Sequence, residues 1–303
     1  MPQKSFLVAG ATGDTGRHTA ALLLARGHRV RALAHRRDAR SEALGARGVE
    51  VVVGDLLCFP DVQAALLGMD GAYFVFPVAP GLVQATAFFA EAARGARVGA
   101  VVNMSQLPAR PGAKSHASLS HWIAERVFDW SGLGVTHLRP TLFAEWLLYV
   151  AGGIGPDGVL RLPFEGGKHA PIAAEDQARV IAAILDDPEP HRGKTYPLFG
   201  PVELTFPQIA AAMSRTLGRA IRYEPADREA FARTARAGGR DEFLVQHVTE
   251  IAQDYRRGIF SGTNDLVERI TGRAPITVED FVARHRAAFG PATSSASSAS
   301  ESL

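Results

Sequence analysis

Three glycines stand at regular spacing near the start of the chain, in the segment Gly10-Ala11-Thr12-Gly13-Asp14-Thr15-Gly16. The segment follows an apolar run typical of a β-strand and opens a helical pattern. Gly10 permits a sharp exit from the strand, Gly13 lets the backbone approach a pyrophosphate, and Gly16 lets the helix pack tightly on the strand. The helix N-terminus adds unpaired N–H groups and a partial positive charge. The spacing therefore predicts a dinucleotide-binding turn, which also includes Thr12, Asp14 and Thr15.

Basic residues follow the second expected strand, where the choice between the two nicotinamide dinucleotides is made. A site that prefers NAD has Asp or Glu there, which accepts hydrogen bonds from the ribose hydroxyls. This chain instead has Ala34-His35-Arg36-Arg37, with Arg40 one helical turn further on. A guanidinium suits the 2′-phosphate of NADP(H), so Arg36 and Arg40 predict that cofactor. A solvated basic turn is the alternative interpretation.

Asp55 and Leu56 come directly after the third expected strand. The carboxylate could accept a hydrogen bond from the adenine amino group, with Leu56 stacked alongside. Alternatively, Asp55 caps the helix that follows. The single cysteine, Cys58, is expected to be a small buried apolar residue and not a redox centre.

The elements that position these residues are indicated by a regular alternation of short apolar runs and helical patterns over the first 150 residues. Strands are expected at residues 5–10, 28–35, 51–53, 71–76, 99–104 and 135–138. Helical patterns cover residues 16–26, 83–94 and 118–130. Apolar strands joined by helices imply a parallel sheet covered on both faces, which is a doubly wound α/β fold.

The regularity weakens after Pro140. Residues 151–170 are rich in Gly and Pro, which predicts an excursion around a cleft and not a strand. A helix at 174–185 and a strand at 195–199 are expected to return to the sheet, and a mostly helical region follows to residue 289. We therefore expect a cofactor-binding domain at 1–150 (with 171–200 returning to it), a smaller, mostly helical substrate domain at 151–290, and a disordered Ser-rich tail at 291–303.

Composition limits the partners of this 303-residue chain. Lys and Arg number 33 against 31 Asp and Glu, so the net charge of +2 gives no electrostatic footprint of a nucleic-acid binder. No apolar stretch approaches the ~18 residues of a membrane span, the N-terminus lacks the apolar core of a signal peptide, and one cysteine fits a reducing compartment. We expect a cytoplasmic protein with a small-molecule substrate, no nucleic acid, no membrane and no metal. A homodimer is an open alternative to a monomer.

Several segments together resemble the NmrA-like branch of the short-chain dehydrogenase/reductase superfamily. Besides the glycine turn, Arg36 and Gly54-Asp55, they are His121-Trp-Ile-Ala-Glu125, Ser131-Gly132-Leu133, residues 136–145, residues 174–178 and residues 193–196. The resemblance covers about residues 5–290, and it implies a Rossmann domain, a small C-terminal domain and a substrate cleft between them. In that family the segment that matches Phe143 borders the nicotinamide. We assign Phe76 and Pro77, where the fourth expected strand ends, to the same cofactor site.

The sequence departs from the superfamily at its catalytic pair. Classical members use a Tyr to exchange the substrate proton, and a Lys four residues later that holds the nicotinamide ribose. With Glu125 as the anchor, the Lys position is His121 and the Tyr position is Ala117, which cannot exchange a proton. His121, with an ordinary pKa of ~6.5, is the candidate for ribose binding and proton transfer, or else it pairs with Glu125. Ser105 matches the catalytic serine, or else its hydroxyl satisfies the end of a strand.

Two functions agree with this pattern. The first is an NADPH-dependent oxidoreductase that transfers hydride to a quinone-, azo- or enone-type acceptor, because such acceptors give stabilised anions and tolerate the missing Tyr. The second is a non-catalytic sensor, in which NADP(H) binding shifts a conformational or oligomeric equilibrium and a partner protein binds the resulting state. The cleft expected around residues 151–170 favours the enzyme.

Overall fold

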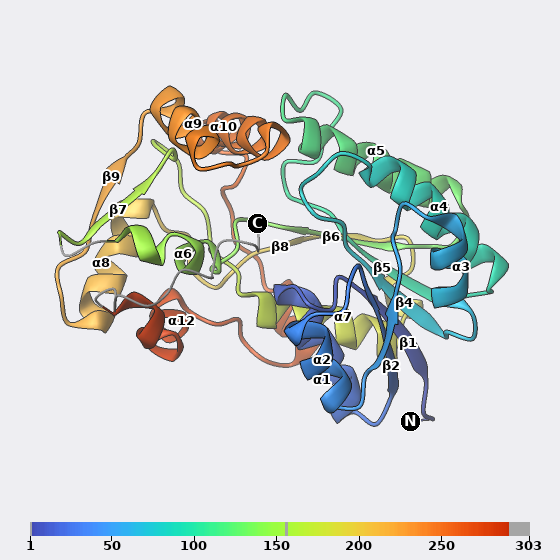
Figure 1. Cartoon of the computed structure of the whole chain (residues 1–303). Coiled ribbons are helices and arrows are strands. Elements are labelled where there is room, and N and C mark those ends of the chain that lie inside the picture. Colours follow the sequence, from blue (N-terminus) through green and yellow to red (C-terminus); the bar gives the residue numbers. More distant parts are fainter. Residues whose placement is uncertain (1, 155–156, 291–303) are drawn as a thin grey trace.

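A seven-stranded parallel sheet forms the centre of the computed structural model, which describes residues 2–154 and 157–290 (Figure 1). Its strands are β1 Ser5–Ala9, β2 Arg29–Ala34, β3 Glu50–Val53, β4 Gly71–Phe74, β5 Ala100–Met104, β6 Thr136–Pro140 and β8 Thr195–Leu198. They lie in the order β3-β2-β1-β4-β5-β6-β8, and all neighbouring pairs are parallel. The order reverses between β1 and β4, which is the switch point where doubly wound folds bind ligands. The expected fold class is confirmed.

Helices cover both faces of this sheet, so its central strands β1, β4 and β5 are buried throughout. All five residues of β1 are buried. One face packs against α1 Asp14–Ala25, α2 Ala39–Ala46, α7 Ala174–Asp186 and α11 Leu266–Thr271, and the other against α3 Phe59–Leu66, α4 Leu82–Gly95 and α5 His116–Trp130 (Figure 1). The strand expected at residues 195–199 does join the sheet, beside β6.

The remaining elements form a smaller lobe, on the left of Figure 1. They are α6 Trp146–Tyr149, β7 Val159–Leu162, α8 Phe206–Leu217, β9 Arg222–Pro225, α9 Arg228–Ala237, α10 Glu242–Arg256 and α12 Val278–Arg284, with 3-10 turns at Ala151–Gly153, Glu189–His191 and Arg286–Phe289. This lobe has its own apolar core, in which Phe164, Phe206 and Tyr255 are buried against one another.

One expectation for the second half of the chain is wrong. Residues 151–170 include a strand, because β7 pairs with β9 in a separate two-stranded parallel sheet. The expectation of a mostly helical C-terminal region is confirmed, with β9 as a short strand within it. The helix α11 also leaves the small lobe: Val267 is buried in the core beneath the large sheet, beside Val180 of α7. Pairing between segments about 60 residues apart leaves no local signal in either four-residue strand.

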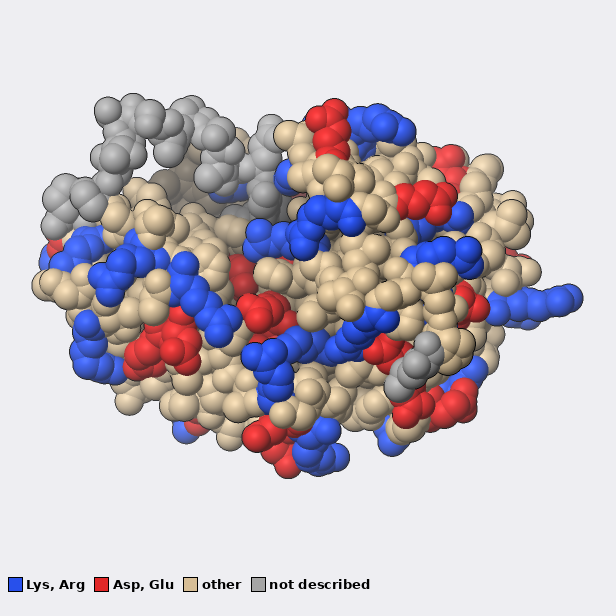
Figure 2. Space-filling model, turned by 90° about the horizontal axis from the view of Figure 1, so that it is seen from below, with Lys and Arg blue, Asp and Glu red and all other residues tan. Residues whose placement is uncertain are grey.

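The surface seen in Figure 2 carries basic and acidic side chains interspersed, without a face of one sign. Among the residues described here, no helix is long and apolar enough to cross a membrane. The same part of the chain contains no group of three or more His, Cys, Asp or Glu side chains arranged to hold a metal ion. The tail expected to be disordered, 291–303, lies outside the described residues.

Candidate cofactor and substrate cleft

A cleft of about 460 Å³ opens at the carboxyl ends of β1, β4, β5 and β6 and reaches α6 and α10 of the small lobe. It brings together most of the site residues predicted from sequence: Gly10, Thr12, Gly13, Asp14, Thr15, Arg40, Phe76, Pro77, Ser105, His121 and Phe143. Gly16, Arg36, Asp55 and Leu56 do not line it.

The glycine turn has the geometry that a diphosphate requires. Gly10 adopts a φ of +60°, and the Gly13 N–H donates to the Gly10 carbonyl at 2.9 Å. A Cβ atom at Gly16 would lie 2.1 Å from the Gly10 carbonyl oxygen, whereas a Cβ at Gly13 would lie 3.3 Å from it. Gly13 is the N-cap of α1 and provides no side-chain cap, so the first N–H groups of the helix remain available to an anion. The turn therefore fits the pyrophosphate of a dinucleotide.

Asp14 places a carboxylate beside this anion site, and two neighbours balance its charge. Arg17 lies 3.1 Å from the Asp14 carboxylate, and the Tyr149 hydroxyl donates a hydrogen bond to it. Burial raises the pKa of Tyr149, so this phenol stays protonated. Tyr149 was not predicted from sequence, because only the tertiary structure brings α6 to the start of α1.

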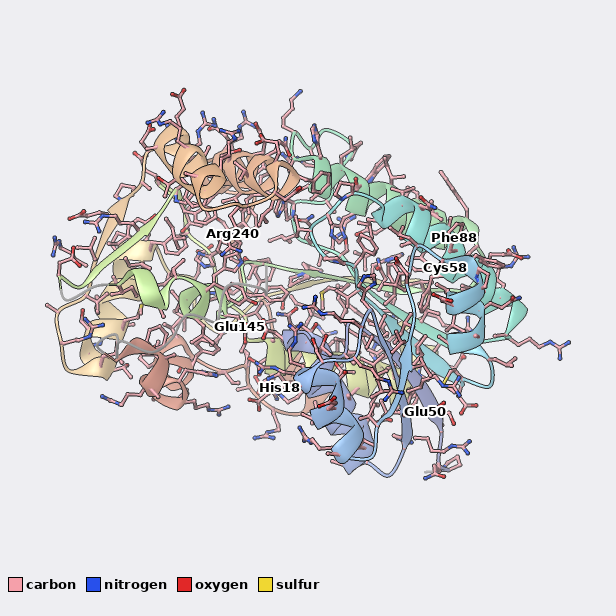
Figure 3. All side chains as sticks on the ribbon, in the orientation of Figure 1. His18, Glu50, Cys58, Phe88, Glu145 and Arg240 are labelled. Carbon is pink, nitrogen blue, oxygen red and sulfur yellow. The ribbon has the colours of Figure 1, made fainter. Side chains whose placement is uncertain are left out.

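Glu145 holds the segment that carries Tyr149. Figure 3 shows it between the two lobes, at the start of α6. Its Oε1 accepts a hydrogen bond from the Ala174 N–H at 3.0 Å, which fastens α6 to the start of α7. Burial raises the pKa of Glu145 to about 7. The carboxyl group is thus a structural cap for a helix distant in sequence.

The two arginines predicted to bind the 2′-phosphate flank the start of α2. Both lie near the Asp38 carboxylate, Arg40 at 3.0 Å and Arg36 at 3.9 Å. Asp38 caps the helix through hydrogen bonds from the Arg40 and Ser41 N–H groups, and these bonds, with Ser41 first, lower its pKa. Sequence reasoning missed Asp38, although the capping-box pattern Asp38-x-x-Ser41 was a signal for it.

Replacing Arg36 with Asp is expected to weaken NADPH binding by about tenfold or more, because a charge-assisted contact to the 2′-phosphate becomes a repulsion. NADH, which lacks that phosphate, should change little. Fluorescence titration with both nucleotides measures the ratio. Arg47→Asp, the same charge change on an exposed residue at the far end of α2, is the matched control. Equal losses for NADPH and NADH would contradict the assignment of Arg36.

The residues predicted beside the adenine form a local turn. Asp55 Oδ1 accepts the Leu57 N–H at 2.8 Å, and Oδ2 lies 3.9 Å from His35 Nδ1. Asp55 does not cap the next helix, because Cys58 occupies the N-cap of α3. Cys58 is half-buried, so the expectation of a buried residue is met only in part.

Ser105, at the end of β5, belongs to a buried polar network beneath the cleft. Its hydroxyl donates to Glu125 Oε1 at 2.5 Å, and Arg139 binds the same carboxylate through Nε at 2.8 Å and a second nitrogen at 2.5 Å. The Glu125 side chain is fully buried, whereas that of Arg139 is 25% exposed. The network fixes the Ser105 side chain at the floor of the cleft.

His121 lines the cleft from α5 and does not make the alternative pair with Glu125. Its Nδ1 is buried without a hydrogen-bond partner among the described residues. Burial lowers the pKa of His121 to about 4, and the nearby His247 acts in the same direction. The expectation that this imidazole titrates near neutrality is therefore wrong: at pH 7 it is neutral. Ala117, assigned from sequence to the position of the family's tyrosine, is buried one turn before it.

Acid is expected to destabilise the fold through its buried histidines. Burial lowers the pKa values of His121 and His247 to about 4 and that of His169 to about 3. The unfolded chain, with pKa values of ~6.5, binds these protons first, so stability is complete above about pH 6.5 and falls as the pH drops toward 4. The free energy of unfolding should fall by about 1–2 kcal/mol per ring at pH 5, as measured by urea denaturation.

His169→Phe provides the control for this pH effect, because His169 lies in the aromatic core of the small lobe and not in the cleft. The variant should lose less stability between pH 7 and pH 5 than the parent protein. Equal stability of the parent protein at the two pH values would contradict the account.

The cleft contains further residues that sequence reasoning missed. They come from the loop after β5, from α6 and from the small lobe: Gln106, Pro108, Trp146, Leu244, His247, Ile251 and Phe260. None follows a recognisable motif, and the approach of α10 to the sheet is a tertiary contact.

The doubly wound sheet, the glycine turn and the cleft at its switch point define a dinucleotide-binding protein of the Rossmann type. Residues 2–256 match the NmrA-like family, and the chain belongs to that family.

Several known proteins of similar sequence are named as reductases, and the solved structures of similar fold also include NmrA, a negative transcriptional regulator, with a TM-score of 0.77 at 18% identity. The chain is 33% identical over 289 residues to an NAD(P)H azoreductase of Xenophilus azovorans, covering 95% of this chain and all of that protein. It is 32% identical to a (4-alkanoyl-5-oxo-2,5-dihydrofuran-3-yl)methyl phosphate reductase of Streptomyces griseus, covering 94% of this chain and 99% of the relative. The NADPH complex of an Escherichia coli NADPH-dependent quinone oxidoreductase superposes with a TM-score of 0.81 at 21% identity, covering 93% of this chain and 99% of that one. At this identity the superposition supports the fold alone.

Proposed function

We propose that this protein is an NADPH-dependent oxidoreductase that transfers hydride to a quinone-, azo- or enone-type acceptor without the Tyr–Lys pair of its superfamily. The observation that carries the proposal is one continuous cleft. It runs from the glycine turn, which fits a diphosphate, to a largely apolar end between two lobes, and Ala117, which we assign to the superfamily's tyrosine position, is buried. The relatives named as reductases, at 32–33% identity over nearly the whole chain, support the same conclusion.

The residues that line the cleft divide the work with Arg36, Asp55 and Leu56, which do not line it. The glycine turn binds the diphosphate, Arg36 and Arg40 bind the 2′-phosphate, and Asp55 and Leu56 border the adenine. Phe76, Pro77 and Phe143 border the nicotinamide, and Ser105 and His121 lie beneath the reacting atoms. When bound, NADPH supplies the hydride, and the protein's task is to orient it against the acceptor.

The proton that completes the reduction comes from solvent in this account. His121 is neutral at pH 7, because burial lowers its pKa to about 4. Such a ring donates or accepts hydrogen bonds but is a poor source of protons at neutrality. Quinones, azo compounds and enones suit this site because hydride transfer gives them stabilised anions, which water can protonate.

The test is NADPH oxidation by the purified protein with a panel of quinones, azo compounds and enones. Turnover well above the uncatalysed rate supports the proposal. Tight NADPH binding without turnover across the panel would contradict it and favour the sensor function.

A further inference from the structure

The end of the cleft farthest from the glycine turn carries no charged side chain among the described residues that line it. Within the described part of the chain, the formally charged lining residues are Asp14, at the start of α1, and Arg40, in α2, both on the cofactor side. The far end is apolar, with Trp146, Leu244, Ile251 and Phe260. An acceptor with a sulfonate or a fixed positive charge would find no counter-charge there, and desolvating an unpaired charge is costly.

One polar group of the cleft nevertheless lacks a partner among the described residues. Gln106 Nε2 is buried without a hydrogen-bond partner among the described residues, directly after Ser105. A buried amide N–H₂ left unpaired costs free energy, which a ligand oxygen at this position would recover. The site therefore presents a hydrogen-bond donor that an acceptor atom on a ligand would satisfy.

His247 of α10 provides a second donor, and a neighbouring hydroxyl fixes its tautomer. Ser115 Oγ lies 2.8 Å from His247 Nδ1 and already accepts the Ser118 N–H at 3.1 Å. Ser115 is completely buried, and His247 Nδ1 is the acceptor that the described residues offer its hydroxyl hydrogen. The hydroxyl therefore donates to Nδ1, which leaves the ring N–H on Nε2.

This Nε2–H has no partner within the described residues, and His247 lines the cleft while only 6% exposed. Burial lowers the pKa of His247 to about 4, so the ring is a neutral donor at physiological pH. Other contacts between α10 and the segment that leads into the start of α5 hold the His247 ring in position. Gln246 Oε1 accepts the His116 N–H at 3.0 Å, and Arg110 forms a bidentate ion pair with Asp254 at 2.8 and 2.6 Å.

We propose that His247, together with Gln106, binds the carbonyl oxygen of an uncharged acceptor, which makes quinones and enones the substrate class of this cleft. The inference rests on the proposed function. The acceptor gains a hydride from NADPH at carbon, the π-electron pair moves onto its oxygen, and water supplies the proton that this oxygen takes up. His247 and Gln106 donate hydrogen bonds to the oxygen as its negative charge develops, and neither loses its proton.

The experiment measures binding apart from turnover. The protein is saturated with NADP⁺, which has no hydride to give, and its affinity for menadione is measured by equilibrium dialysis. His247→Phe, which keeps a ring but removes the donor, should weaken menadione binding about five- to tenfold. His247→Gln keeps an N–H donor and should recover most of the affinity. A sulfonated naphthoquinone should bind the parent protein at least about tenfold more weakly than menadione.

Gln246→Ala is the matched control. Gln246 makes the same kind of link from α10 to the loop before α5, through Lys114 and His116, but does not line the cleft. The Gln246→Ala substitution should change menadione affinity by less than about twofold relative to the parent protein. An equal loss in Gln246→Ala and His247→Phe would mean that His247 only positions α10, and would overturn the proposal. No measurable menadione binding by the parent protein, or affinity unchanged in a folded His247→Phe protein, would also overturn it.

Steady-state oxidation of NADPH by menadione separates this proposal from the function on which it rests. Menadione binding that depends on His247 but is not followed by turnover would keep the subsite and contradict the oxidoreductase. Turnover combined with menadione binding that does not depend on His247 would support the oxidoreductase and contradict the subsite.

Discussion

Replacing Gly13 with Asp is expected to abolish NADPH binding, with a loss of affinity of more than about 100-fold, while the protein stays folded. The new carboxylate would lie against the pyrophosphate, and its Cβ would occupy the space into which the phosphate must approach. The fold should survive because that Cβ lies 3.3 Å from the Gly10 carbonyl oxygen, a contact that a small shift relieves. Fluorescence titration with NADPH measures the affinity, and circular dichroism measures the fold.

Two other glycines make this test specific. Gly112→Asp places the same side chain in an exposed loop where nothing lies within 4 Å, and should bind NADPH normally. Gly16→Ala should instead damage the fold itself, since its Cβ would lie 2.1 Å from the Gly10 carbonyl oxygen. Near-normal NADPH affinity in Gly13→Asp would mean that the glycine turn does not hold the pyrophosphate.

Replacing Glu125 with Ala is expected to lower the free energy of unfolding by about 3 kcal/mol or more. The change removes the acceptor of two hydrogen bonds from Arg139 and one from Ser105, at a fully buried position. It leaves a largely buried guanidinium without its carboxylate, and that unpaired charge dominates the cost. Urea denaturation at pH 7 measures the loss.

Ser105→Ala is the comparison, because it removes only one hydrogen bond of the same network and should cost about 1 kcal/mol. Glu125→Gln keeps an oxygen acceptor and should fall between the two. A Glu125→Ala protein as stable as Ser105→Ala would contradict a structural role for the Glu125–Arg139 pair.

The features that sequence predicts well here are those with a local cause. The glycine turn is one example, because Gly10 adopts a positive φ and Gly16 lies too close to the Gly10 carbonyl for any side chain. The strands of the large sheet are another, because burial on both faces leaves continuous apolar runs such as Phe6–Ala9. The assignment of Ala117 to the tyrosine position stays a prediction from sequence.

Features that depend on distant segments leave no such signal. β7 and β9 are four residues each, and neither is a strand without the other. The Tyr149–Asp14 hydrogen bond joins residues 135 apart, and the Ser115–His247 bond joins residues 132 apart. The ordinary pKa assigned to His121 from its residue type failed for the same reason, because burial of the ring is a property of the tertiary structure.

The most direct test of the central claim is a single-turnover oxidation of NADPH by menadione, followed at the nicotinamide absorbance with deuterium at either face of C4. The account predicts rapid oxidation by the parent protein, none above background by Gly13→Asp, and a slower rate with deuterium at one face only. That result would place hydride transfer in this cleft. Binding of NADPH with no oxidation above background, or a rate indifferent to deuterium at both faces, would contradict hydride transfer as this protein's rate-determining chemistry with quinones.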